Sequence, residues 1–149
     1  MTIYFYKVQE QYGCFSNFSP HSIVMGAVQW PTSEHYYQAQ KFIGTEDEAV
    51  ICEQIRPCPS PEQAAALGRD RIRVIRPDWD QTKDQVMYEA VKTKFSSHPE
   101  ICSVLLATGS EEIVEDSPND YYWGCGADKT GENHLGKILM RVREELRLA

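Results

Sequence analysis

Hydrophobic residues recur every three to four positions in two long segments of the chain. The first segment runs from about Asp80 to Phe95, and the second follows Asn133, a residue type that often caps helices. This spacing places the hydrophobic side chains on one face of a helix. We therefore predict two amphipathic helices, with the core-facing residues Val86, Met87, Ala90, Val91 and Phe95 in the first and Leu135, Ile138, Leu139, Val142 and Leu146 in the second.

Start and stop signals predict four shorter helices. Ser and Thr oxygens can accept hydrogen bonds from the free amides of a first helical turn, and glycine readily takes the left-handed conformation that ends a helix. Thr45 and Glu48 have the spacing of a capping box, in which each side chain bonds the backbone amide of the other residue. The expected helices run from Thr32 or Ser33 to Ile43 (before Gly44), from Thr45 to before Pro57, from Ser60 to Gly68, and from Pro99 to Ala107 (before Gly109).

Segments rich in β-branched and aromatic residues predict a few short strands. They are Ile3 to Tyr6, Ile23 to Trp30 with Met25-Gly26 as a turn, and Ile113 to Glu115, while Arg69 to Arg76 is expected to be extended and Asp116 to Asn133 to form a loop. A loop of this length is often functional. The predicted fold is α+β, a helix-rich single domain over residues 1–149 with a small antiparallel N-terminal sheet, in which the polar segments meet at one cleft.

The overall charge and composition limit the classes of function. A formal net charge of -7 opposes broad attraction to a nucleic-acid backbone, although a sugar phosphate or a single flipped base remains compatible with it. The chain has no apolar run that could span a bilayer and no signal-peptide pattern at its start, so we expect a cytoplasmic protein without a membrane partner. Its five cysteines form no Cys-x-x-Cys pair, which fits a reducing compartment.

One face of the first predicted helix carries a carboxylate, an amide and an amine. Glu34, Gln38 and Lys41 are separated by four and three residues and therefore share that face. The alternative is a solvated helix surface, but the flanking aromatic residues leave little polar area for one. The helix dipole should favour the ionised form of Glu34, and enclosure by aromatic side chains would make Lys41 a nucleophile.

Two further polar segments are candidates for the same cleft. Asp120, Trp123 and Gly124 could bind a flat heterocycle through charge, stacking and close backbone approach. The alternative is an Asp in a turn followed by a core Trp. Ser16 and Asn17 could bind a ribose or could only complete a turn.

Positive charge is densest just after Gly68. Arg69 or Arg71 is therefore a candidate phosphate clamp, although both could equally be plain surface arginines. His35 and His134 lack the partners that metal ligands normally have nearby, so we expect no metal site. The chain also has no phosphate-binding glycine loop or serine-nucleophile motif, and we expect no cofactor.

The order of these segments resembles the NADAR family of NAD- and ADP-ribose-associated proteins. The resemblance extends over nearly the whole chain. It rests on Phe15-Ser16-Asn17-Phe18, Trp30 to Tyr36, Gln38 to Phe42, Gly68-Arg69, Trp79, Met87, Lys94-Phe95, Leu105 to Thr108, Val114-Glu115, Asn119-Asp120, Tyr122-Trp123-Gly124, and Asn133 with Leu135-Gly136. The stretch Gly126 to Thr130 departs from the family pattern.

The resemblance implies hydrolysis of the bond between ribose C1 and an exocyclic amine of a base-like ring. In the YbiA-like branch of N-glycosidases, the implied substrates are ribosylaminopyrimidine phosphates of riboflavin synthesis, and in other branches they are ADP-ribose adducts on guanine. The residues that carry over are Glu34, Lys41 and Asp120 as catalytic groups, and Trp123, Arg69 and Asn133 as binding groups. A non-catalytic module that binds ADP-ribose or a nucleotide is a further alternative.

Two chemical routes fit that activity. Cleavage of a glycosylamine can pass through an oxocarbenium-like centre, which a carboxylate such as Glu34 or Asp120 would stabilise. The sugar ring can instead open to an imine, and Lys41 could then displace the amine to form a Schiff base.

Overall fold

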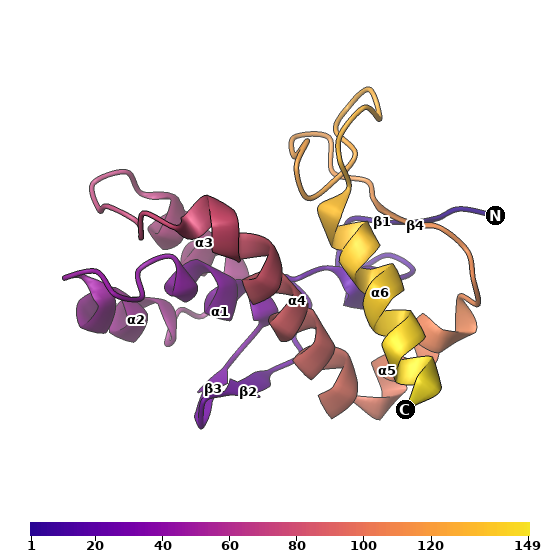
Figure 1. Ribbon diagram of the computed structural model, residues 1–149, viewed down its shortest axis with the longest axis horizontal. Helices are drawn as coiled ribbons and strands as arrows, with labels where there is room; N and C mark the ends of the chain where they lie inside the picture. Colours follow the sequence, from indigo (N-terminus) through magenta and orange to yellow (C-terminus); the bar gives the residue numbers. More distant parts are fainter.

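The computed structural model describes residues 1–149 and confirms the helix-rich α+β class (Figure 1). The helices are η1 (Gly13–Phe15, a 3₁₀ turn), α1 (Ser33–Gln40), α2 (Glu48–Ile55), α3 (Pro61–Arg69), α4 (Trp79–Ser97), α5 (Pro99–Ala107) and α6 (His134–Leu148). The strands are β1 (Ile3–Phe5), β2 (Ile23–Met25), β3 (Val28–Trp30) and β4 (Ile113–Glu115).

The strands form two separate two-stranded sheets. β2 and β3 make the predicted antiparallel hairpin, but its turn lies at Gly26-Ala27, where both residues have positive φ. β1 instead pairs in parallel with β4, with Phe5 opposite Glu115, and the two strands lie side by side close to α6 (Figure 1). The prediction that β1 belongs to one N-terminal antiparallel sheet was therefore wrong, because the local pattern of a strand does not reveal a partner that is distant in sequence.

All six predicted helices are present, and two of them have the predicted side-chain caps. The Thr32 hydroxyl accepts a hydrogen bond from the His35 amide at 3.1 Å, and the Ser60 hydroxyl accepts one from the Gln63 amide at 3.2 Å. α1 ends at Gln40 rather than Ile43, and turns lead from there to Gly44, whose φ is 83°. The predicted apolar faces of α4 and α6 lie in one hydrophobic core.

Three local predictions were wrong. α2 begins at Glu48 rather than at a Thr45 cap, because the Thr45 hydroxyl donates to the Phe42 carbonyl and the Glu48 carboxylate accepts from the Gly44 amide. Asn133 precedes α6 but does not cap it with its side chain, which binds β4 instead. The segment from Arg69 to Arg76 is not extended at its start, since Arg69 completes α3 and a turn and a bend occupy residues 71–73.

Lys94 is a charged residue type buried in the core. Its side chain is 1% exposed, and its Nζ donates to the Ser16 carbonyl at 2.8 Å. Burial lowers the pKa of Lys94 to about 7. The lysine thereby connects α4 to the segment that contains Ser16 and Asn17.

No helix is both long and apolar enough to cross a bilayer.

Candidate active site

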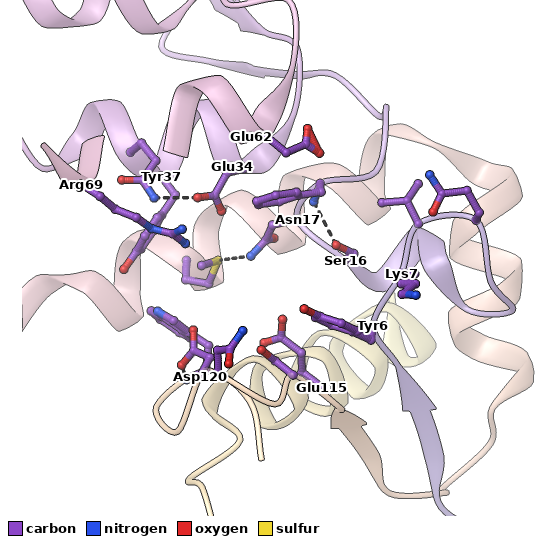
Figure 2. A pocket seen from close by; sticks show the side chains of 18 of the residues that line it. Tyr6, Lys7, Ser16, Asn17, Glu34, Tyr37, Glu62, Arg69, Glu115 and Asp120 are labelled. Atoms are coloured by element: carbon purple, nitrogen blue, oxygen red, sulfur yellow. Dashed lines mark hydrogen bonds between the residues drawn. The ribbon is translucent and has the colours of Figure 1, made fainter. Parts of the chain in front are cut away.

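A cavity of about 710 Å³ lies between α1 and α3 on one wall and the segment after β4 on the other. Figure 2 shows Glu34 and Arg69 on the first wall, and Asp120, Glu115 and Tyr6 on the wall that faces it. The lining comes from six parts of the chain. They contribute Tyr6 to Gln9; Ser16, Asn17 and Phe18; Glu34, Tyr37, Gln38 and Lys41; Glu62 and Arg69; Met87; and Glu115, Ser117, Asn119, Asp120 and Trp123.

The predicted polar face of α1 forms part of this cavity. Glu34 is only 5% exposed, and the Gln38 side-chain amide donates to its carboxylate at 2.6 Å. Tyr36 and Ala39 point into the hydrophobic core. The alternative of a solvated helix surface is therefore wrong for this face.

The pKa of Glu34 shifts in the opposite direction to the one predicted. Burial raises the pKa of Glu34, and the nearby Asp120 also raises it, while the Gln38 hydrogen bond, Arg69 and Lys41 act in the opposite direction. The helix dipole led us to expect the ionised form to be favoured. The net shift is the reverse, because removal of the carboxylate from water outweighs these favourable contacts.

Lys41 is held at the end of the same face. Its Nζ donates to the Gly68 carbonyl at 3.4 Å and lies 5.8 Å from the centre of the Tyr37 ring. Burial, together with the charges of Arg69 and Lys83, lowers the pKa of Lys41 to about 8, although Glu34 acts to raise it. About a tenth of this amine is therefore uncharged at pH 7, far more than for an ordinary lysine, and the uncharged form is the nucleophile.

Gly68 lets α3 approach α1 closely enough to bring Arg69 to the cavity. A side chain at this position would place its Cβ 2.8 Å from the Gln38 Cβ, as well as against the Gln38 amide oxygen. Real Cβ atoms are essentially never that close, so the two helices would have to move apart or Gln38 would have to leave Glu34.

We predict that Gly68→Ala lowers the free energy of unfolding by roughly 1–3 kcal/mol, the usual cost of overpacking a dense contact. Turnover should fall as well, because Gln38 would lose its position beside Glu34. Thermal unfolding and a rate assay measure the two effects. Ala66→Ser, an exposed change on the same helix, is the control: it should lower the free energy of unfolding by less than about 0.7 kcal/mol and leave turnover unchanged.

Asp120 both forms a turn and lines the cavity. One of its carboxylate oxygens accepts from the Tyr122 amide at 3.0 Å and from the Trp123 amide at 2.8 Å. The Trp123 ring meets the Tyr37 ring edge-on, with 5.6 Å between centroids. The Tyr122 hydroxyl donates to Asp84 on α4 at 2.5 Å, which fixes this part of the loop.

Ser16 and Asn17 also lie in the wall, but their side chains already have partners. The Asn17 side-chain oxygen accepts from the Ser33 hydroxyl at 2.8 Å, and its backbone carbonyl accepts from the Glu34 amide at 3.2 Å. The Ser16 hydroxyl accepts from the Phe18 amide at 3.1 Å. Both residues therefore complete a turn, and Asn17 in addition fixes the start of α1.

Three candidates lie outside the lining. Asn133 is buried under β4, where its side chain donates to the Ile113 carbonyl and accepts from the Glu115 amide, both at 2.9 Å. Gly124 packs against the same strand, and a Cβ there would be 2.9 Å from the Glu115 carbonyl. Arg71 is exposed and does not reach the cavity, whereas Arg69 does. Gly124 and Asn133 thus shape the loop that carries Asp120 and Trp123.

Glu115 is the most informative lining residue to which sequence reasoning assigned no role. Burial raises its pKa to about 8, and Asp120 and Glu34 add to the shift. One of its carboxyl oxygens is buried without a hydrogen-bond partner. The sequence could have pointed to Glu115 through its position, because it ends a predicted strand that leads directly into the predicted functional loop.

The cavity has no obvious metal-binding arrangement. No group of three or more His, Cys, Asp or Glu side chains is placed to hold a metal ion. The chemistry that the lining itself offers is that of a buried carboxyl beside a lysine of low pKa, with an aromatic ring and an arginine in the same cavity.

Comparison with known proteins identifies the family. The NADAR domain matches residues 4–147, and the chain belongs to this family. It is 60% identical to the N-glycosidase Npun_R5314 of Nostoc punctiforme, covering 99% of this chain and 94% of that protein. It is 46% identical to the N-glycosidase YbiA of Escherichia coli, covering 97% and 88% of the two chains.

A solved structure and a longer relative extend the comparison. The NMR structure of E. coli YbiA matches with a TM-score of 0.89 at 45% identity, over 99% of this chain and 86% of that one. The chloroplastic riboflavin biosynthesis protein PYRR of Zea mays is 45% identical, and the match covers 97% of this chain but 25% of that protein. The protein is accordingly an enzyme, a hydrolase that acts on N-glycosyl compounds.

Proposed function

We propose that this enzyme cleaves the bond between ribose C1 and the exocyclic amine of ribosylaminopyrimidine phosphates, the reactive intermediates of riboflavin synthesis. The products would be ribose 5-phosphate and a free aminopyrimidine. Relatives named N-glycosidase support the bond type, and relatives named for riboflavin biosynthesis in maize and Vibrio vulnificus support the pathway.

The observation that carries this proposal is the meeting of Glu34 and Lys41 in one cavity with Trp123 and Arg69. The elongated substrate has a phosphate at one end, the anomeric carbon in the middle and a flat ring at the other end. Arg69 would bind the phosphate, Glu34 and Lys41 would face C1, and Trp123 would stack on the ring.

In the proposed reaction, Lys41 is the nucleophile. The sugar ring opens to an imine between C1 and the exocyclic nitrogen, and the free amine of Lys41 adds to C1. The bond from C1 to the exocyclic nitrogen then breaks, and this nitrogen takes a proton and leaves as the aminopyrimidine. Water adds to the new C1–Lys41 imine, and ribose 5-phosphate leaves as the aldehyde while the amine is restored.

Glu34 would exchange protons in these steps. A buried carboxyl with a raised pKa can give a proton to the departing nitrogen and later accept one from the attacking water. Asp120, on the facing wall, would stabilise the positive charge of the imine.

Incubation with a panel of substrates, followed by mass identification of the products, tests the proposal. We expect ribosylaminopyrimidine phosphates to yield ribose 5-phosphate and free base, and to be preferred over ADP-ribosyl guanosine. Preference for the guanosine adduct would assign the enzyme to that substrate class instead. Calorimetric binding of ADP-ribose without turnover of any panel member would indicate a binding module and overturn the proposal.

The pKa of Lys41 predicts the pH dependence of the rate. Only the free amine reacts, and below a pKa of about 8 its fraction falls roughly tenfold per pH unit. We therefore expect kcat/KM to rise with pH up to about pH 8. Glu115 has a pKa in the same range, so Glu115→Gln is the control and should keep the rising limb. A limb that levels off near pH 10 would contradict the proposed role of Lys41.

A further inference from the structure

Glu115 is a cavity residue that the proposed reaction does not use. It is the last residue of β4, and its backbone is fixed on every side: its amide donates to Asn133 and its carbonyl accepts from the Cys125 amide, each at 2.9 Å, while Phe5 pairs with it across the sheet. Its side chain is therefore presented to the cavity from a rigid support (Figure 2).

The hydrogen bonding of this side chain is incomplete. One carboxyl oxygen is fully buried and has no partner, although nearly all buried polar groups in folded proteins have one. An unpaired buried acceptor lowers the stability of a folded protein. The second carboxyl oxygen has no hydrogen-bond partner within the protein either, and Glu115 lines the cavity, so a bound molecule is the natural partner of this carboxyl.

The position of Glu115 indicates which part of the substrate it would meet. Arg69 and Lys41 both act on the pKa of Glu34, so the phosphate-binding and reactive groups lie together on one wall. The groups that act on the pKa of Glu115 are Asp120 and Glu34, and none of the three cations of the lining, Lys7, Lys41 and Arg69, is among them. No cation near Glu115 is therefore available to pair with a phosphate. With C1 at Glu34 and Lys41, the chain of atoms that continues away from Arg69 is the exocyclic nitrogen and its ring.

We propose that Glu115 binds the polar edge of the heterocycle and thereby sets which bases the enzyme accepts. This inference rests on the proposed function. At neutral pH the raised pKa keeps the carboxyl largely protonated, so that it offers one O–H donor beside one acceptor. The complementary ring edge has an acceptor beside a donor, as in a lactam or in a ring nitrogen next to an amino group.

The test compares two substrates that share the ribose phosphate and the exocyclic nitrogen but differ in the polar groups of the ring. The first is a ribosylaminopyrimidinone 5′-phosphate, and the second is N-phenylribosylamine 5′-phosphate, whose ring has no hydrogen-bonding group. Wild type should prefer the first by roughly 100-fold or more in kcat/KM, since a site built to bind a polar group rejects analogues that lack it. Glu115→Leu should lower kcat/KM about 100-fold on the first substrate. On the second substrate the same variant should lower kcat/KM by no more than about tenfold.

Two control variants distinguish the proposed contact from misfolding and from a general loss of negative charge. Glu115→Gln keeps one donor and one acceptor, so it should retain activity on the pyrimidinone within about tenfold of wild type. Glu112→Leu removes an exposed carboxyl shortly before it in the chain and should change neither substrate's rate. Calorimetry with the free aminopyrimidinone should show binding that weakens in Glu115→Leu, while ribose 5-phosphate binds equally to both proteins.

The results separate the two proposals. If wild type cleaves neither substrate, the proposed function fails and this inference fails with it. If wild type cleaves the pyrimidinone but Glu115→Leu loses equally on both substrates, or binds the free base as well as wild type does, the function stands and the role of Glu115 is overturned. The same conclusion follows if Glu115→Gln is as impaired as Glu115→Leu.

Discussion

Lys41→Met is expected to lower turnover by roughly 1000-fold or more, because it removes the proposed nucleophile while keeping a long apolar side chain against Tyr37. Trapping gives a direct readout. Reduction with borohydride during turnover should attach one ribose phosphate to wild type at Lys41, visible by mass after digestion. Lys41→Met should carry no adduct.

Controls separate the covalent route from a passive role of the charge. Lys137→Met removes an exposed lysine on α6 and should leave both the rate and the trapped adduct unchanged. Lys41→Arg restores the positive charge but cannot form the imine, so it should be as inactive as Lys41→Met. Near-normal turnover by either Lys41 variant, or an unmodified Lys41 after reduction, would refute the Schiff-base route and leave direct cleavage through an oxocarbenium-like centre.

Glu34→Gln is expected to lower turnover by on the order of 100-fold or more, the usual cost of losing one group that acts in the transition state. Glutamine has nearly the same shape, so its effect reports on the proton and the charge rather than on packing. The substitution has a second signature. Glu34 raises the pKa of Lys41, so its neutralisation should shift the rising limb of kcat/KM from about pH 8 toward lower pH.

The pH profile of this variant distinguishes the two roles of Glu34. A lower plateau together with the shifted limb is the expected result. A shifted limb with an undiminished plateau would restrict Glu34 to an electrostatic effect on Lys41 and exclude it from proton transfer. Glu112→Gln, at an exposed position, is the matched control and should reproduce the wild-type profile.

Local signals in the chain predicted most of the helices. The amphipathic spacing of α4 and α6 and the serine cap of α3 depend on neighbouring residues, so they could be recognised without the fold. The same holds for the shared face of Glu34, Gln38 and Lys41, which helix geometry alone places together. The failed predictions involve partners from elsewhere in the chain, as with β1 and β4, or competing local bonds, as with Thr45 and Phe42.

The amino-acid sequence by itself determined the helical class, the polar face of α1 and the set of residue types available for chemistry, because these follow from local spacing and side-chain identity. Only the tertiary structure decided which of those residues share a cavity. It also decided that Asn133 and Gly124 pack against β4 outside the cavity, and that Glu115 lines the cavity. It also reversed the direction of the pKa shift of Glu34. The physical reason is that burial and long-range contact set the cost of a charge, and neither is defined until distant segments have packed together.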